Sequence, residues 1–168
     1  DGDVFAPLGV VGAEAIEARS VGFSSTHLGA GRNKLFVRGI ADHARMVRGR
    51  CLHYGEGITY WPLQEIVSQV GDLRRTLHGT PDGELAVIRL EAALGVTDTP
   101  VSPEEIAWGV RRLLEAIANS EPLIAVFDDI HWAEPAFLDL IEYVASFAQE
   151  VPLLVLCTAR PDLFELRR

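Results

Sequence analysis

Two adjacent carboxylates, Asp128 and Asp129, follow an unbroken apolar run that begins at Leu123. A strand without polar alternation is typical of a parallel sheet that is covered on both faces, and such sheets bind ligands at the carboxyl ends of their strands. At that edge one acid can hold Mg²⁺ while its neighbour orients an attacking water. We therefore expect Asp128 to be the metal ligand and Asp129 to be catalytic. The alternative is a buried strand whose last Asp only starts the next helix.

A cation, Arg160, follows the next apolar run, which extends from Val151 to Cys157. Strand, helix and strand form a right-handed crossover, which makes the two strands parallel. Arg160 is then expected at the same edge of the sheet as the acids, where it can reach a terminal phosphate. A solvated loop arginine is the alternative. The helix between the strands is predicted by apolar residues at helical spacing: Phe137, Leu138, Ile141, Val144, Ala145 and Ala148.

The rest of the chain supplies further elements of an α/β domain. Segment 45–51 predicts a short strand, and Pro62 marks the first turn of a helix. Ser102 and Glu105 form a capping box that opens a longer helix. The turn residues of 78–84 predict a loop. The longer helix is expected to bury Ile106, Val110, Leu113, Leu114 and Ile117.

Three phrases of the sequence together resemble one protein family. In the family's order they are GRCLHYGEGITYWPLQEI (49–66), LIAVFDDIHWAEPAFLDLIEY (123–143) and LLVLCTARPDL (153–163). They resemble the AAA-like STAND P-loop ATPase module of bacterial LuxR-type and antibiotic-regulatory transcription activators. The same module occurs in multidomain proteins with a class III adenylate/guanylate cyclase domain. The combination is more specific than any single phrase, and it covers the chain from Leu35 onward.

The resemblance implies a P-loop NTPase fold, a three-layer α/β/α domain with a parallel sheet, truncated before the last strand and the lid. It implies ATP and Mg²⁺ as cofactors, with Asp128 and Asp129 in the Walker B motif. It also implies that Arg160 is the sensor arginine, on a strand between the Walker A and Walker B strands. The expected boundaries are a poorly matched segment at 1–25 and a partial ATPase domain at 26–168, with Walker A-like 26–35, Walker B 123–129 and sensor 1 strand 153–160.

The phosphate loop is where the chain departs from the family pattern. In THLGAGRNKL (26–35), Gly29 and Gly31 keep their places, but the usual lysine is Arg32 and the usual Ser or Thr is Asn33. An arginine fork does not automatically fit a lysine nest, and asparagine lacks the hydroxyl that binds Mg²⁺. Three interpretations stay open: a degenerate loop whose four named residues still bind nucleotide but which hydrolyses it poorly, a loop that binds nothing, and a segment that does not represent the true loop.

Two ring side chains, His131 and Trp132, come directly after the acids. The resemblance places them in the same phrase as the acids. From the residues alone, we expect Trp132 to pack beneath the start of the next helix and His131 to cap that helix.

Composition excludes several other classes of protein. The 168 residues are 48% hydrophobic, which permits one compact domain with a core. Apolar runs are too short for a membrane span and no signal peptide is recognisable, so the expected location is cytoplasmic. A net charge of −9 without a basic block argues against direct nucleic-acid contact. Cys51 and Cys157 lack metal or redox spacing, which indicates small buried residues.

The sequence favours an ATP-binding regulatory module of a larger bacterial signalling or transcription-regulatory protein, whose nucleotide state controls attached domains. Whether it is also an ATPase of the AAA/STAND type depends on the altered loop. The expected partners are ATP, a helical lid and a DNA-binding or cyclase output domain of the same polypeptide, and further copies in a nucleotide-dependent oligomer. The alternative is a catalytically inactive pseudo-NTPase scaffold that acts through protein–protein contacts.

Overall fold

The structure is a computed structural model of the chain, and it describes residues 4–11, 44–53, 59–148, 150–160 and 163. The described strands are β1 (Val4–Val11), β2 (Arg45–Arg50), β3 (Leu123–Asp128) and β4 (Leu153–Ala159). The described helices are α2 (Trp61–Val70), α3 (Leu73–Leu77), α4 (Gly83–Ala93), α5 (Pro103–Ser120) and α6 (Pro135–Phe147), with the short 3₁₀ helix η1 (Ile130–Trp132) between β3 and α6.

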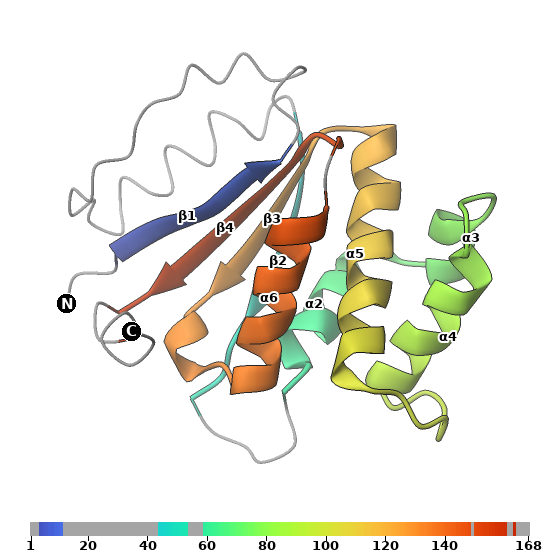
Figure 1. Cartoon of the computed structure of the whole chain (residues 1–168), viewed down its shortest axis with the longest axis horizontal. Coiled ribbons are helices and arrows are strands. Elements are labelled where there is room, and N and C mark those ends of the chain that lie inside the picture. The colour runs from blue at the N-terminus through green and yellow to red at the C-terminus, as the bar shows by residue number, and fades with distance from the viewer. Residues whose placement is uncertain (1–3, 12–43, 54–58, 149, 161–162, 164–168) are drawn as a thin grey trace.

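The described strands form one sheet in the order β1-β4-β3-β2 (Figure 1). β2, β3 and β4 are parallel, with Phe127 opposite both Gly49 and Cys157. The connection from β3 through α6 to β4 is the predicted crossover, so the α/β class with a parallel sheet is confirmed. The acids at the end of β3 and Arg160 after β4 therefore lie at the same edge of the sheet.

β1 differs from the other strands because it pairs with β4 in the antiparallel direction. The pairing register shifts between Pro7 and Val10, as expected for an edge strand that contains a residue without a backbone N–H. The resemblance implies a Walker A strand beside β4, whereas the described neighbour on that side is β1, which ends at Val11. The predicted phosphate loop, with Gly29, Gly31, Arg32 and Asn33, lies outside the described residues.

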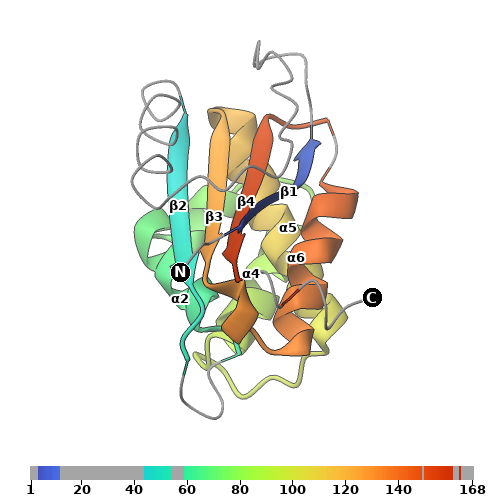
Figure 2. The same ribbon diagram turned by 90° about the vertical axis from the view of Figure 1, so that its left-hand side faces the viewer.

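The described helices pack on one face of the sheet (Figure 2). α5 and α6 contact each other and lie over the central strands, α2 covers β2, and α3 and α4 pack on the outer side of α5. They account for one helical layer of the expected three-layer fold. The core between this layer and the sheet includes Phe127, Phe137 and Leu114, each at most 1% exposed.

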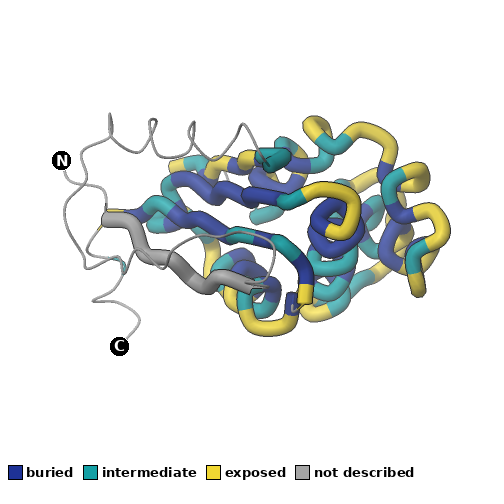
Figure 3. Tube along the Cα trace, turned by 90° about the horizontal axis from the view of Figure 1, so that it is seen from above, coloured by how far each residue is buried: buried dark blue, intermediate teal, exposed yellow. Residues whose placement is uncertain are grey.

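The side chains of β3 alternate between two faces of the sheet, and the two faces have different surroundings. Leu123, Ala125 and Phe127 enter the core beneath the helices. Ile124 and Val126 point to the opposite face, where they form a smaller cluster with Leu156 of β4. All six residues of the strand are buried, as the dark central strands of Figure 3 show. Since Asp128 continues the second series, its carboxylate projects from the face opposite the described helices.

The predicted helix signals are confirmed. Ser102 accepts a hydrogen bond from the backbone of Glu105 at 3.2 Å, and the Glu105 carboxylate accepts one from Ser102 at 2.9 Å. All five residues that this helix was expected to bury are buried. Pro62 lies in the first turn of α2, as predicted. One boundary prediction is wrong: α4 begins at Gly83, inside the segment 78–84 that its turn residues predicted as a loop.

Candidate functional site

Asp128 is one of two buried carboxylates among the described residues, at 7% exposure. The other, Glu115, is neutralised on its own helix by Arg111 and Arg112. Asp128 instead takes its partner from a strand eighty positions away, since Nε of Arg48 donates to its Oδ2. Its Oδ1 accepts from the hydroxyl of Thr158 at 3.2 Å. Both carboxylate oxygens are therefore occupied by donors from the two strands that flank β3.

Asp129 turns the chain away from the sheet. Its backbone has the left-handed φ of 56°, a conformation that Asp tolerates better than most residues. Its carboxylate accepts from Nε of Arg50 at 2.9 Å and pairs with a terminal nitrogen of the same guanidinium at 2.8 Å. Both nitrogens reach the same oxygen, Oδ2, and hydrogen bonds between two charged groups are stronger than neutral ones. The pair holds Asp129 beside the end of β2.

Thr158 joins the two acids to β4. Besides donating to Asp128, its hydroxyl accepts from the backbone N–H of Asp129 at 2.9 Å. One side chain thus fixes a carboxylate and the turn that follows it. A Thr at this position of β4 faces the same side of the sheet as Asp128, because both follow the alternation of the second cluster.

Arg160, the predicted sensor, lies at this edge but does not pair with either acid in a described contact. Its guanidinium stacks over the ring of Trp132, 5.1 Å from the centroid. The Trp132 and His53 rings also meet in a T-shaped arrangement, with their centroids 4.2 Å apart. Trp132 is 37% exposed, so the expectation that it packs beneath the next helix is wrong. Its open side carries the arginine instead.

Side chains of α2 form hydrogen bonds with the backbone of β2 along the edge that faces away from β3. The Gln69 amide accepts from the backbone N–H of Arg48 at 3.0 Å and donates to the Arg48 carbonyl at 2.6 Å. The Glu65 carboxylate accepts from the backbone N–H of Arg50 at 2.6 Å. Within the described part of the chain these bonds occupy the outer edge of β2, and they fix the backbone from which both arginines project.

The electrostatics of this edge follow from burial and close charge. The hydrogen bond to Asp129 raises the pKa of Arg50 further above its ordinary value. Burial raises the pKa of Cys51 to about 12, with Asp129 and Asp128 adding to the effect. Burial also raises the pKa of Cys157 to about 12. Both thiols are protonated at neutral pH, which agrees with their prediction as small buried residues.

The donor set suits a hard divalent cation that brings its own oxygen ligands. Among the described residues there is no group of three or more His, Cys, Asp and Glu side chains that would enclose an ion. Mg²⁺ commonly needs only one or two carboxylates, with phosphates and waters completing an octahedron. Asp128, at the end of β3, could provide one such carboxylate, with Asp129 beside it. Metal contact at Oδ2 of Asp128 requires the Arg48 guanidinium to move, because it occupies that oxygen.

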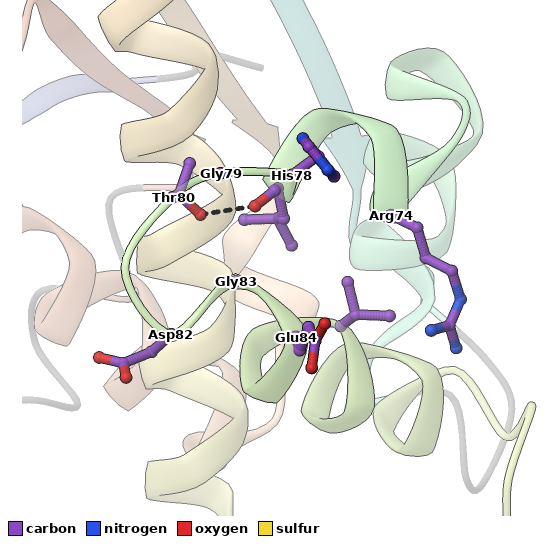
Figure 4. A pocket seen from close by; sticks show the side chains of 9 residues that line it. Arg74, His78, Gly79, Thr80, Asp82, Gly83 and Glu84 are labelled. Carbon is purple, nitrogen blue, oxygen red and sulfur yellow. Dashed lines mark hydrogen bonds between the residues drawn. The ribbon is translucent and has the colours of Figure 1, made fainter.

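Two hollows differ in size and in chemistry. A hollow of about 40 Å³ adjoins the edge described above and is lined in part by Cys51, Trp132 and Glu134. A larger one, of about 540 Å³, lies between α3 and α4, where the Thr80 hydroxyl donates to the Leu77 carbonyl at 2.8 Å (Figure 4). Its walls contain none of the predicted site residues. The larger hollow therefore does not coincide with the predicted site.

Sequence reasoning missed Arg48, Arg50 and the role of Trp132. A signal for the arginines was present, because Arg48 and Arg50 alternate along a strand that lies parallel to the Asp-terminated one. Period two places them on the face of Asp128 once the register is known. The register itself, Arg50 opposite Asp128, is not visible in the sequence.

No helix in the described part of the chain is long and apolar enough to span a membrane. Residues 34–156 match the family model described as AAA ATPase domain. The match includes β2 and β3 with both acids, begins after the predicted phosphate-loop residues, and ends before Thr158 and Arg160. No curated protein and no solved structure matches the chain. Because the model matches well over half of the sequence, the chain belongs to the AAA ATPase domain family and has the α/β architecture of P-loop NTPases.

Proposed function

We propose that the chain is a regulatory ATP-binding module of the STAND type, which binds ATP with Mg²⁺ and controls attached domains of a larger bacterial protein. The carrying observation is the placement of Asp128 at the carboxyl end of a buried parallel strand, in a member of the AAA family. Asp129 and Arg160 at the same edge support it, because acids for a metal and a cation for a phosphate belong together.

In this proposal Asp128 holds Mg²⁺ through water, Asp129 orients the attacking water, and Arg160 senses the terminal phosphate. Bound Mg²⁺ supplies neutralisation of charge on the phosphate oxygens. Trp132 stacks against the Arg160 guanidinium and keeps it at the edge of the sheet. The backbone and side chains of Gly29, Gly31, Arg32 and Asn33 are assigned to the phosphates by sequence alone.

The proposed output is a change in the population of two domain arrangements. A nucleotide that contacts both this module and a helical lid favours the closed arrangement in proportion to its differential affinity. A DNA-binding or cyclase domain on the same polypeptide then responds, and further copies join if the closed form exposes an oligomer contact. The assignment of these partners rests on the sequence resemblance.

The second candidate function is a pseudo-NTPase scaffold that acts through protein contacts. Its specific support is that both acids are already neutralised by arginines, Arg48 on Asp128 and Arg50 on Asp129. The departures at Arg32 and Asn33 point the same way. A scaffold would retain the fold and the ion pairs without binding nucleotide.

Calorimetric titration with Mg²⁺ and ATP separates the two candidates. For a nucleotide module we expect saturable binding that Asp128→Asn weakens at least about tenfold, which corresponds to about 1.4 kcal/mol. Asp98→Asn is the matched control, because it removes the same charge from an exposed residue between α4 and α5. No binding by a folded chain, or binding that Asp128→Asn leaves intact, contradicts the proposal.

A repair of the loop gives a second test. Arg32→Lys combined with Asn33→Ser restores the family's residues at the two altered positions. If the loop is degenerate but correctly placed, the affinity for ATP rises. If this segment does not represent the true loop, titration of the repaired chain gives the same result as wild type.

A further inference from the structure

Two ion pairs at the edge of the sheet, which also carries Arg160 and Glu65, form a neutral set without any metal. Arg48 pairs with Asp128 and Arg50 pairs with Asp129, so two positive and two negative charges cancel. A divalent cation added to this set leaves two uncompensated positive charges in a partly buried place, which is unfavourable. Metal binding is therefore best described as an exchange of one cation for another.

We propose that Arg48 competes with the divalent cation for Asp128 and thereby sets the metal affinity of the site. The inference rests on the proposed function for the identity of the metal site, and it adds a residue that regulates that site. In the metal-free state the guanidinium substitutes for the ion. In the loaded state it swings away from the carboxylate into solvent.

Exposure and anchoring fit this exchange. The Asp128 side chain is 10% exposed, whereas that of Arg48 is 63% exposed. The carboxylate is thus fixed and recessed, and the arginine reaches it from the solvent side. The backbone of Arg48 is clamped by Gln69 through two hydrogen bonds of 3.0 and 2.6 Å. Only the side chain needs to move, and it exchanges one charged hydrogen bond for hydration.

The neighbouring pair explains why the competition falls on Asp128. Arg50 holds Asp129 through two nitrogens, and the Asp129 side chain is 25% exposed. Among the described residues Arg48 contacts its carboxylate through Nε alone. The single contact is the easier one to displace. Thr158 keeps Oδ1 of Asp128 in place during the exchange, since it bonds that oxygen and the next backbone N–H.

Mn²⁺ binding to the full chain, with and without ATP, tests the proposal. The electron paramagnetic resonance signal of free Mn²⁺ decreases as the ion binds, which gives the affinity. Arg48→Gln removes the competing charge, and we expect Mn²⁺ to bind about tenfold more tightly than to wild type. Arg45→Gln is the matched control on the same strand, where Arg45 faces Glu121 at 3.7 Å. We expect it to change Mn²⁺ affinity by less than about twofold.

Arg48→Lys provides a second variant, because lysine keeps the charge but lacks the guanidinium fork. It should bind Mn²⁺ with an affinity between those of wild type and Arg48→Gln. If Arg48→Gln does not fold, Arg48→Lys still tests the proposal. Equal or weaker Mn²⁺ binding by the Arg48 variants, or no binding by any chain, overturns the proposal. Tighter Mn²⁺ binding by Arg48→Gln without ATP binding by any chain supports the exchange and refutes the nucleotide function.

Discussion

The two ends of the β2–β3 strand pair carry ion pairs of the same chemistry in different surroundings. At the start, Arg45 faces Glu121 at 3.7 Å with side chains 32% and 52% exposed. At the end, Arg48 holds a carboxylate that is only 10% exposed. Exposed pairs contribute little to stability, while a recessed acid depends on its partners. The two ends of this strand pair therefore differ in how deeply their carboxylates are buried.

The largest effect is expected from Gly49→Ala, which displaces the backbone at the end of the strand pair that carries Asp128. A Cβ at Gly49 would lie 2.8 Å from Cβ of Pro62 and closer still to the Pro62 carbonyl. α2 must then move from β2, and with it the side chains that clamp Arg48 and Arg50. We expect the free energy of unfolding to fall by about 3 kcal/mol, measured by urea denaturation.

Gly109→Ala in α5 is the control for that substitution. Its added Cβ would lie 3.3 Å from Cβ of Arg89, an overlap that a shift of a few tenths of an ångström between α4 and α5 relieves, and alanine favours the helix. The free energy of unfolding should change by less than about 1 kcal/mol. Equal losses of stability in the two variants would show that β2 and α2 are not packed more closely at Gly49 than α4 and α5 are at Gly109.

The buried thiols predict a loss of stability at high pH. Cys51 and Cys157 have pKa values of about 12 in the fold, against an ordinary value of 9.0. Below pH 9 both states keep the proton, so the thiols have no effect. Above it the unfolded chain releases protons first, and the free energy of unfolding falls by up to about 1.4 kcal/mol per pH unit for each thiol.

Urea denaturation at pH 8 and pH 10 measures this loss. A Cys51→Ala and Cys157→Ala double variant is the comparison, since it retains every other group that titrates in this range. Its stability should fall less than that of wild type between the two pH values. If the free energy of unfolding fell equally in wild type and in the double variant, the two thiols would not be shielded from water in the folded state.

Thr158→Val tests the link between the acids and β4. The change keeps the shape but removes the hydroxyl that donates to Asp128, and it leaves the backbone N–H of Asp129 without that acceptor. We expect a loss of about 2 kcal/mol in the free energy of unfolding. Thr97→Val, in the exposed loop after α4, should cost less than about 0.5 kcal/mol. Similar small losses would show that the Thr158 contacts are replaced by water.

The smallest effects are expected from replacing one arginine at each end of the β2–β3 strand pair. Arg48→Gln should lower the free energy of unfolding by about 1 kcal/mol, because a recessed carboxylate loses a charged donor. Arg45→Gln should lower it by less than about 0.5 kcal/mol. Thermal and urea denaturation at low ionic strength measure both. If the two variants lose the same amount, the ends do not differ in the way their burial indicates.

Local signals predicted much of the fold. The apolar runs ending at Asp128 and before Arg160, and the capping box at Ser102, specify β3, β4 and α5 because each signal is contained in one short segment. No helix was predicted for 73–77 or for 83–93, and the loop predicted at 78–84 extended into the first turn of α4. These helices pack beside α5, and the turn residues around Gly83 concealed where α4 begins.

The site was only partly predictable, because its contacts join distant strands. Asp128, Asp129 and Arg160 end or follow strands, so topology alone brought them to one edge. The partners of the acids depend on register, and a one-residue slip would have turned Arg48 and Arg50 to the other face. The role of Trp132 depended on the turn at Asp129, whose left-handed backbone the sequence does not specify.

The most direct measurement is the broadening of the indole N–H resonances of Trp132 and Trp108 by Mn²⁺ with ATP. Trp132 lies at the edge with the acids, and Trp108 lies in α5 on the opposite face of the sheet. If Asp128 holds the metal of a bound nucleotide, Trp132 broadens more strongly than Trp108, and Asp128→Asn abolishes the difference. Equal broadening of the two resonances, or none in a folded chain, would contradict a metal–nucleotide site at the end of β3.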